Sequence, residues 1–273
     1  MNAVEINNLQ FVYGNNKFPF SFELNVADWK IPKGEFVCLL GANGSGKSTL
    51  LKLIAGLLSF KTGSIKINEN YTLSMSRKEL AKKVAYVPQK NFSFFPFSVY
   101  EIVMMGRTPY LNMMGFENSL DRQIVEEALA TMQVERLKQK GINEISGGEA
   151  QRVFIARALA QKAEIILLDE PNAHLDLEHQ IMIFDFLKKL NSEQKITVLA
   201  VSHDLNLVGI FSKKVALMNE GSIILEGDKS EVLNEKNIAE VFKINSAVFP
   251  SQDSKSLNVL VNPVAQLTKT ELH

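Results

Sequence analysis

The sequence has little cysteine, no excess charge of either sign and no long apolar run. Cys38 is its single cysteine, so no disulfide can form within the chain, which fits a reducing compartment such as the cytosol. Thirty basic side chains balance thirty acidic ones, which argues against a nucleic-acid binder, because such proteins usually carry a basic excess. No apolar stretch approaches the roughly 18–20 residues that cross a bilayer, and we expect no signal peptide. Any tie to a membrane would therefore go through a partner protein.

Apolar residues make up 46% of the chain, which is enough for a sizeable core. Two β-rich segments come first, at residues 3–13 and 20–29. Short apolar runs typical of buried strands follow, with helical segments between them, at residues 35–40, 84–87, 164–169 and 196–202. This alternation predicts an α/β fold with a parallel sheet and crossover helices, preceded by an antiparallel β portion.

One internal segment differs in character. Strand patterns are absent from residues 91–145, whereas helical periodicity is clear at 98–106 and 118–132. We therefore predict a helical insert over about residues 91–160, inside a main domain of residues 1–243. A C-terminal extension, residues 244–273, has no role that the sequence assigns, and its last ten residues or so have the composition of a loose tail.

A glycine-rich loop follows the first buried strand. Its sequence, Gly-Ala-Asn-Gly-Ser-Gly-Lys-Ser-Thr, fits the phosphate-binding pattern G-x-x-x-x-G-K-[ST]. Glycines let backbone N–H groups turn toward phosphate oxygens, and the helix that starts at Lys47 directs its positive end there. Lys47 is expected to contact the β- and γ-phosphates, and the Ser48 hydroxyl to bind Mg²⁺. The predicted phosphate-binding residues are Gly41, Asn43, Gly44, Ser45, Gly46, Lys47, Ser48 and Thr49.

Two carboxylates and a histidine follow two neighbouring buried strands. Asp169 and Glu170 end the strand at 164–169, and His203 follows the strand at 196–202. The carboxyl ends of parallel strands border the crevice in which α/β proteins bind ligands. We expect Asp169 to hold the hydration shell of Mg²⁺, Glu170 to orient and deprotonate the attacking water, and His203 to sense the γ-phosphate.

A second helix start also has features of an anion site. In Ile-Ser-Gly-Gly-Glu-Ala-Gln, residues 145–151, Ser146 and Glu149 have the spacing of a capping box. Gly147 and Gly148 leave the first N–H groups of that helix accessible to an anion. Two phosphate-binding helix starts exceed what one nucleotide requires. With this motif the sequence resembles the ABC transporter ATPase family over about residues 3–243.

The resemblance implies a homodimer in which the phosphate loop of one subunit and the Ser-Gly-Gly motif of the other enclose each Mg·ATP. Tyr13 resembles the aromatic residue that stacks on adenine, and Gln89 resembles the glutamine that touches Mg²⁺. Asp176 corresponds to a loop that passes between the subunits. Catalytic roles then fall to Lys47, Gln89, Glu170 and His203, and Mg²⁺ contacts to Ser48, Gln89 and Asp169. From the second subunit the expected ATP contacts are Ser146, Gly147, Gly148 and Glu149.

Two further segments resemble one subgroup of the family, the importers of iron siderophores, haem and cobalamin. These segments are residues 99–111 and 175–180. The resemblance implies a subunit on the cytoplasmic face of the membrane, with permease subunits as direct partners and a substrate-binding protein as an indirect one. Aromatic and methionine side chains in 91–116 are expected to form the core of the insert and, in part, a permease groove around Met113 and Met114.

Three alternative functions are compatible with parts of this pattern. An importer for zinc, manganese or another small solute would carry the same motifs. A soluble ABC ATPase of translation or DNA repair would usually have two cassettes or a long coiled coil between the motifs. Only about a hundred residues separate Gly46 from Ser146, and there is one cassette. A P-loop kinase or GTPase has no need of the second helix start.

Overall fold

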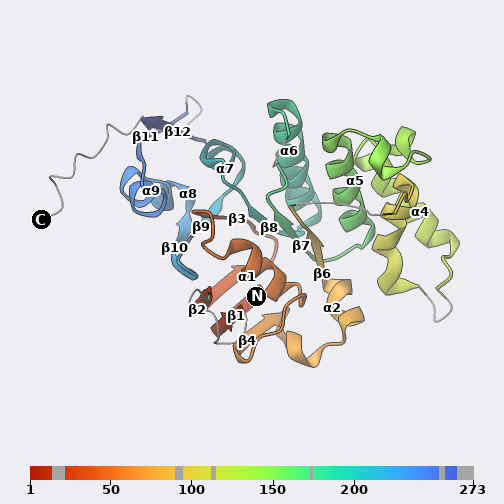
Figure 1. Ribbon diagram of the computed structural model, residues 1–273, viewed down its shortest axis with the longest axis horizontal. Coiled ribbons are helices and arrows are strands. Elements are labelled where there is room, and N and C mark those ends of the chain that lie inside the picture. Colours follow the sequence, from red (N-terminus) through yellow and green to blue (C-terminus); the bar gives the residue numbers. More distant parts are fainter. Residues whose placement is uncertain (14–21, 90–94, 112–114, 173–174, 252–255, 263–273) are drawn as a thin grey trace, which may run out of the picture.

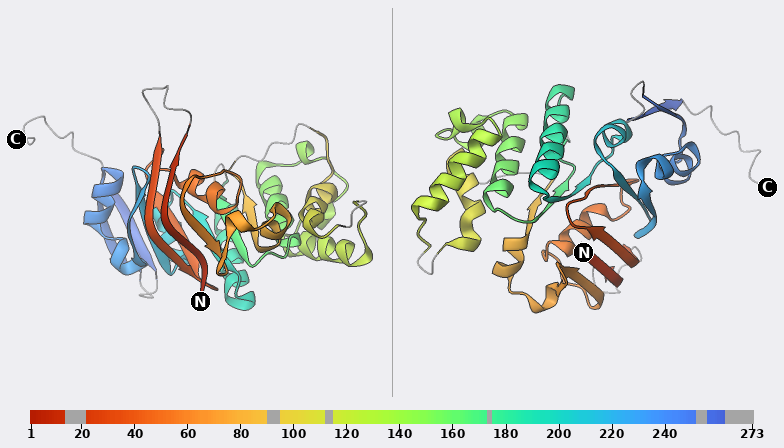
Figure 2. Two further views of the ribbon diagram at one scale, coloured as in Figure 1. Left: turned by 90° about the horizontal axis from the view of Figure 1, so that it is seen from below. Right: turned by 180° about the vertical axis from the view of Figure 1, so that it is seen from behind.

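The computed structural model describes residues 1–13, 22–89, 95–111, 115–172, 175–251 and 256–262. The chain forms an α/β core with a helical lobe at one end and a small C-terminal hairpin at the opposite end (Figures 1 and 2). No helix in the described ranges is long and apolar enough to cross a membrane.

A six-stranded sheet runs through the centre of the core. Its strands are β3 (Phe36–Gly41), β6 (Val84–Val87), β7 (Ile165–Asp169), β8 (Thr197–Val201), β9 (Lys214–Asn219) and β10 (Ser222–Asp228). They lie in the order β10-β9-β3-β8-β7-β6, and all neighbours are parallel except β9 and β10. Every residue of β3, β7 and β8 is buried, because other elements cover both faces. The predicted α/β fold with a parallel sheet is confirmed.

An antiparallel sheet and one helix cover the first face. The strands are β1 (Asn2–Val12), β2 (Glu23–Pro32), β4 (Thr62–Ile67) and β5 (Asn70–Tyr71), in the order β2-β1-β4-β5. Helix α1 (Lys47–Ile54) lies between the two sheets, and its apolar side chains share one core with Val37 and Leu39 of β3. The predicted antiparallel portion is therefore confirmed, although β4 and β5, which follow α1, also belong to it.

The second face of the central sheet carries the other core helices except α2, whose Leu80 packs in the cluster of the first face. Cys38 and Leu40 of β3 point to this face, because successive side chains of a strand alternate between faces. They pack in one cluster with Phe184 and Val208. The helices outside the insert, apart from α1, are α2 (Arg77–Lys83), α6 (Leu177–Gln194), α7 (Leu205–Phe211), α8 (Lys229–Val232) and α9 (Glu235–Phe242), with a 3-10 turn at Thr72–Ser74.

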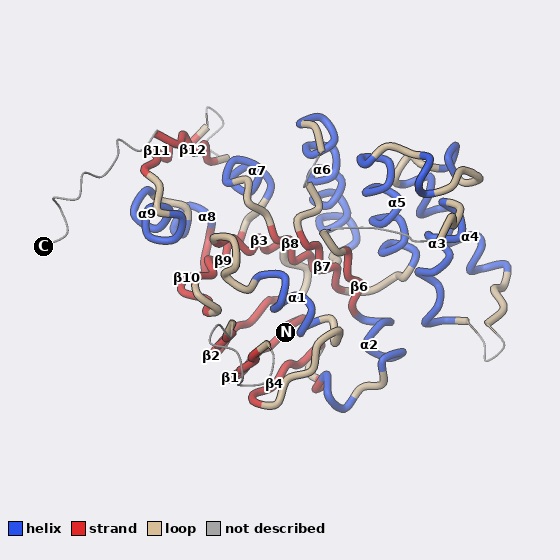
Figure 3. Tube along the Cα trace, in the orientation of Figure 1, coloured by secondary structure: helices blue, strands red, loops and turns tan. Residues whose placement is uncertain are grey.

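The lobe at one end is made of helices and loops (Figure 3). Its α-helices are α3 (Val99–Met104), α4 (Ser119–Thr131) and α5 (Gly147–Ala160), and its 3-10 turns are Met105–Tyr110, Glu135–Leu137 and Ile142–Glu144. In the described part of this lobe the sole β-type pairing is a single bridge between Ser98 and Gly141. The helical periodicity at 98–106 and 118–132 therefore corresponds to real helices.

Capping boxes fix where several of these helices begin. In each box the first residue accepts a hydrogen bond from the backbone N–H three residues later, and the acidic side chain there accepts one in return. The predicted box at Ser146 is present. The boxes occur in the pairs Ser76–Glu79, Ser98–Glu101, Asn118–Asp121 and Ser146–Glu149.

Two polar side chains, the buried Arg107 and the half-buried Gln161, tie the end of α5 to its surroundings. Arg107 pairs with Asp121 at 2.9 Å and also donates to the Ala160 carbonyl at 2.8 Å. Gln161, just after α5, donates to the carbonyl of Val84 at 2.8 Å. These contacts connect the helical lobe to strand β6 of the core.

The extension that the sequence left unassigned contains a hairpin. Strands β11 (Asn245–Pro250) and β12 (Leu257–Asn262) form a separate two-stranded antiparallel sheet. An isolated hairpin is marginally stable in water, so it needs a surface to pack on. Val259 provides the contact, because its side chain is buried in the main core cluster. The expected loose tail falls on residues 263–273, which lie outside the described ranges.

Candidate functional site

The phosphate loop joins β3 to α1, as the motif requires. Gly41 ends β3 so close to β9 that an added Cβ would lie 2.1 Å from the Met218 carbonyl oxygen. Gly46 caps α1 with a φ of 106°, which an L side chain rarely adopts. Packing against β9 therefore requires glycine at position 41, and the backbone conformation requires glycine at position 46.

The Lys47 ammonium lies on the inner side of this loop. It donates to the carbonyls of Gly41 and Ala42, both at 2.9 Å, and lies 3.4 Å from Ser45 Oγ. Burial lowers the pKa of Lys47, although the nearby charges of Glu170 and Asp169 act in the opposite direction. A buried cation surrounded by loop carbonyls is placed to move onto phosphate oxygens when these enter the loop.

Ser48 and Asp169 meet across the junction of α1 and β7. The Ser48 hydroxyl donates to Asp169 Oδ1 at 2.8 Å, and the Tyr86 hydroxyl donates to Oδ2 at 3.1 Å. Burial raises the pKa of Asp169, and the charge of Glu170 adds to this effect. Hard oxygen ligands this close together fit Mg²⁺, which takes few protein ligands and completes its shell with water and phosphate. Tyr86 was not among the predicted site residues, because a tyrosine inside an apolar strand carries no distinguishing pattern.

Glu170, Gln89 and His203 form a second polar cluster. The Glu170 carboxylate accepts from Gln89 Nε2 with one oxygen and contacts His203 Nε2 with the other. These residues follow β6, β7 and β8, which are neighbours in the sheet. Glu170 has a φ of 51°, a conformation that non-glycine residues adopt at an energetic cost and that is common at active sites.

A cavity of 350 Å³ lies beside the phosphate loop. Loop residues, Lys47 and Glu170 line it, together with the aromatic rings of Tyr13 and Phe22. Tyr13 is 43% exposed and stands edge-on to Phe11, with ring centroids 4.9 Å apart. An exposed ring at the rim can stack on a planar base, as expected for Tyr13. Phe22 was not predicted as a site residue. Its position beside Tyr13 on the paired segment could have indicated that it lines the same cavity.

The Ser-Gly-Gly motif lies elsewhere, at the start of α5 in the helical lobe. Ser146 caps the helix, and the pKa of Glu149 is lowered by the hydrogen bond from the Ser146 backbone and by the Ser146 hydroxyl. None of the motif residues lines the 350 Å³ cavity. Asp176 caps α6, where it accepts from the backbone and the ring of His179, at 2.9 and 2.6 Å. Within one chain these predicted contacts are therefore not brought to the phosphate loop.

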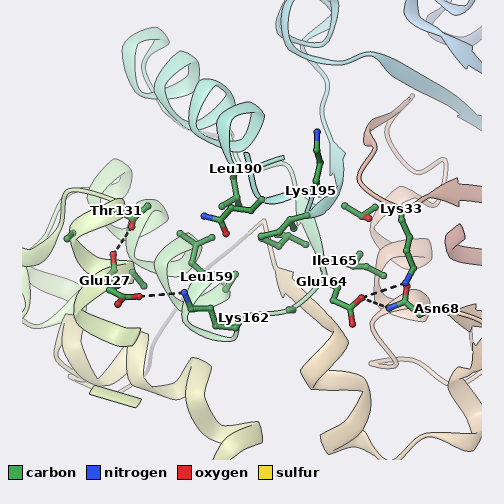
Figure 4. A pocket seen from close by; sticks show the side chains of 18 residues that line it. Lys33, Asn68, Glu127, Thr131, Leu159, Lys162, Glu164, Ile165, Leu190 and Lys195 are labelled. Carbon is green, nitrogen blue, oxygen red and sulfur yellow. Dashed lines mark hydrogen bonds and ion pairs between the residues drawn. The ribbon is translucent and has the colours of Figure 1, made fainter. Parts of the chain in front are cut away.

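Another cavity, of 730 Å³, is at the opposite edge of the sheet (Figure 4). It lies where the helical lobe meets the starts of β7 and β8, with the Glu127–Lys162 ion pair and Glu164 on its walls. Ligands of α/β folds bind at the carboxyl ends of the strands, and this cavity is at their amino ends. It is therefore separate from the phosphate loop.

A family model described as ABC transporter matches residues 24–173, which include the phosphate loop, the motif of α5 and the Asp169–Glu170 pair. The chain belongs to the ABC transporter family. It is an ATP-binding, ATP-hydrolysing subunit of this family, which confirms the resemblance seen in the sequence.

Related proteins and structures agree with this assignment. The chain is 37% identical to the iron(3+)-hydroxamate import ATP-binding protein FhuC of Bacillus subtilis, over 91% of this chain and 90% of that protein. It is 35% identical to the petrobactin import ATP-binding protein FpuD of Bacillus anthracis, over 90% and 88%. A structure described as a metal-chelate type ABC transporter in an inward-facing conformation superimposes with a TM-score of 0.83, at 29% identity, over 97% of this chain and 99% of that one. The dimeric ATP-binding cassette MJ0796 bound to ADP and phosphate gives 0.70, at 30% identity, over 82% and 98%.

Proposed function

We propose that two copies of this chain enclose two Mg·ATP, hydrolyse them, and thereby power uptake of an iron chelate through membrane permease subunits. The observation that carries the proposal is the division of the ATP-binding elements over one chain. The phosphate loop, Asp169, Glu170 and His203 lie together, whereas Ser146 caps a helix in the other lobe. A second copy would bring its own Ser146 helix start to the phosphate loop and complete the site.

The chain's own residues divide the chemistry. The loop and Lys47 bind the phosphates. Ser48 and Asp169 would hold Mg²⁺, which would neutralise charge on the phosphate oxygens. Glu170 holds the attacking water and accepts its proton. Gln89 and His203 bond to the two carboxylate oxygens of Glu170, so they fix its orientation toward that water. The partner's helix start supplies N–H groups to the γ-phosphate.

A groove suits the permease partner. A cavity of 570 Å³ lies between the end of α1, α2, the end of β6 and the end of α5, so that both lobes contribute walls. Its lining includes Leu57, which is 60% exposed, Pro88 next to Gln89, and Arg157. A helix of a membrane subunit placed there would contact both the core and the helical lobe and would lie next to Gln89. Its movement would therefore be linked to the angle between these two parts and to the catalytic glutamine. A peripheral position at the cytoplasmic face of the membrane follows from this docking.

The expected groove residues Met113 and Met114 lie outside the described residues, as do Phe92 and Phe94. Among their described neighbours, Phe97 and Met104 pack against the core cluster, whereas Phe95 and Phe116 are exposed. The lining of the 570 Å³ cavity includes none of these four. The part of the groove expected around Met113 and Met114 therefore stays a prediction.

The cargo proposal rests on the relatives. Proteins named for hydroxamate and petrobactin import match nine-tenths of this chain, and a structural neighbour described as metal-chelate type matches nearly all of it. The ATPase subunit itself need not contact cargo. An iron siderophore is therefore proposed as the cargo, with haem and cobalamin as the other members of the class.

The test combines one substitution with two readouts. Glu170→Gln keeps the size and the polar contacts of the side chain but removes the base, so ATP binding should persist while hydrolysis falls by roughly 10²–10⁴-fold. Cells that carry this variant should lose uptake of radiolabelled ferric siderophore and keep uptake of solutes served by other systems. Hydrolysis at the wild-type rate would contradict the role of Glu170. Unchanged siderophore, haem and cobalamin uptake, with loss of another solute such as zinc, would overturn the cargo.

A further inference from the structure

The C-terminal hairpin and the catalytic cluster face each other across a cavity of 530 Å³. One wall consists of Glu170, His203 and neighbouring residues, and the other includes Val259 and Val261 of β12. Among the described residues of the hairpin, those that line this cavity have apolar side chains. The hairpin is nevertheless linked to the segment that carries His203 through hydrogen bonds.

Asn206 makes that connection. Its side-chain carbonyl accepts from the Val259 N–H at 2.7 Å, and its side-chain N–H donates to the Val259 carbonyl at 3.2 Å. The amide thus satisfies one residue of the β12 edge as a neighbouring strand would. Gly209, one turn later, lets the backbones approach, because an added Cβ would lie 2.3 Å from the Leu257 carbonyl oxygen.

Asn206 is also tied to the segment that carries His203. It lies in the first turn of α7, three residues after the histidine. Asp204, the cap of α7, accepts from the backbone N–H groups of Asn206 and Leu207, both at 2.9 Å. The path from Val259 to His203 therefore runs through two pairs of hydrogen bonds and one helical turn.

We propose that Asn206 is a positioning residue, which holds His203 against Glu170 by anchoring α7 to the C-terminal hairpin. This inference rests on the proposed role of Glu170 and His203 in hydrolysis. The hairpin, for which the sequence offered no role, then sets the geometry of the catalytic cluster. ATP binding does not depend on this anchor, because the phosphate loop and Tyr13 belong to other elements.

The test is the kinetics of Asn206→Ala in the full-length chain. A shift of about 1 Å at a catalytic group costs up to roughly 10²-fold, so kcat should fall by roughly ten- to a hundredfold while KM for ATP stays within about twofold. Asn191→Ala is the matched control. Its amide also makes two hydrogen bonds to the backbone, here as donor to the carbonyls of Gly34 at 2.9 Å and Ile196 at 2.8 Å, but at the far edge of the sheet. This control should keep the wild-type kcat.

A second comparison separates positioning from general loss of structure. In a His203→Ala background, Asn206→Ala should cause no further loss of kcat, because the residue that it positions is already gone. Val259→Pro removes the N–H from the other side of the contact and should reproduce the kcat defect of Asn206→Ala. An equal loss in the His203→Ala background, or a wild-type kcat for Asn206→Ala, would overturn the inference. If instead His203→Ala and Glu170→Gln both hydrolysed ATP normally, the proposed function itself would fail.

Discussion

At the scale of single residues, the site combines groups that burial makes costly. Asp169 is 3% exposed and shares its two oxygens between Ser48 and Tyr86. Burial raises the pKa of Asp169, so its ionised form disfavours folding when no cation is bound. The positive φ of Glu170 adds backbone strain, which further lowers the stability of the folded state. Such costs are typical of sites selected for function rather than for stability.

A substitution at Asp169 should therefore separate stability from activity. Because the folded pKa of Asp169 lies above the unfolded one, its ionisation lowers stability as pH rises through the ordinary aspartate range. Asp169→Asn removes this ionisation, so the nucleotide-free variant should melt at a higher temperature than the wild type at pH 7. The difference should shrink as pH falls toward about 4, the ordinary aspartate pKa, and vanish below it, because Asp169 is then protonated in both states. Mg²⁺-dependent hydrolysis should be lost. Thermal melts across pH, with an ATPase assay at pH 7, measure both; a variant that is less stable at pH 7 would contradict the prediction.

At the scale of elements, α5 performs two tasks with one helix start. Its capping box stabilises the helix within the lobe through the N–H groups of Ser146 and Glu149. The N–H groups of Gly147 and Gly148, between them, are proposed to meet the γ-phosphate of the partner's ATP. Helix α3 begins with the same box, in which Glu101 N to Ser98 Oγ is 3.2 Å, against 3.3 Å from Glu149 N to Ser146 Oγ. Helix α3 therefore shows how much such a box contributes to stability alone, and α5 can be compared with it.

The two serines should differ in function but not in stability. Ser146→Ala and Ser98→Ala each remove one cap, which typically costs about 1 kcal/mol of folding free energy. The two urea midpoints should therefore shift by similar amounts. Ser146→Ala alone should weaken ATP-driven dimerisation and lower ATPase activity. Equal activity losses for the two variants would show that the start of α5 acts through stability only.

The elements also show what sequence patterns can and cannot predict. The phosphate loop, the strand that ends in Asp169 and the box at Ser146 are local patterns, and each lies where it was expected. Periodicity gave the helices of the insert for the same reason. Tyr86 and the Asn206–Val259 contact join residues that are distant in the chain, and nothing in the local sequence marks such partners. The hairpin at 245–262 was missed because its strands pair with each other and bury few side chains.

At the scale of the whole molecule, the phosphate loop and the Ser146 helix start lie apart in one chain, and both are proposed to meet the same second copy. Asp176 and the Ser146 helix start lie outside the cavity beside the phosphate loop. Sequence resemblance implied this division, and the single-chain structure is consistent with it. The roles of the individual residues at the dimer contact remain predictions, and complementation between two inactive variants tests them directly.

Mixed dimers should recover activity that neither parent has. Lys47→Ala disables the phosphate loop. Gly147→Asp places a carboxylate against the partner's phosphates, and it should fold, because an added Cβ there meets nothing within 4 Å. In an equal mixture half of the dimers are mixed and hold one intact site, so about a quarter of wild-type activity should return if the sites act independently. A mixture as inactive as its parents would contradict a site shared between copies.

Cys38 gives this chain a practical property. It is fully buried in β3, and burial raises the pKa of its thiol to about 12, so almost no thiolate forms at neutral pH. Maleimide reagents should therefore leave the folded wild-type protein unmodified. A cysteine introduced at an exposed position of the hairpin or the helical lobe would be the one labelled site. Fluorescent or spin probes could then follow the opening and closing of the lobes during turnover without any need to replace the native residue.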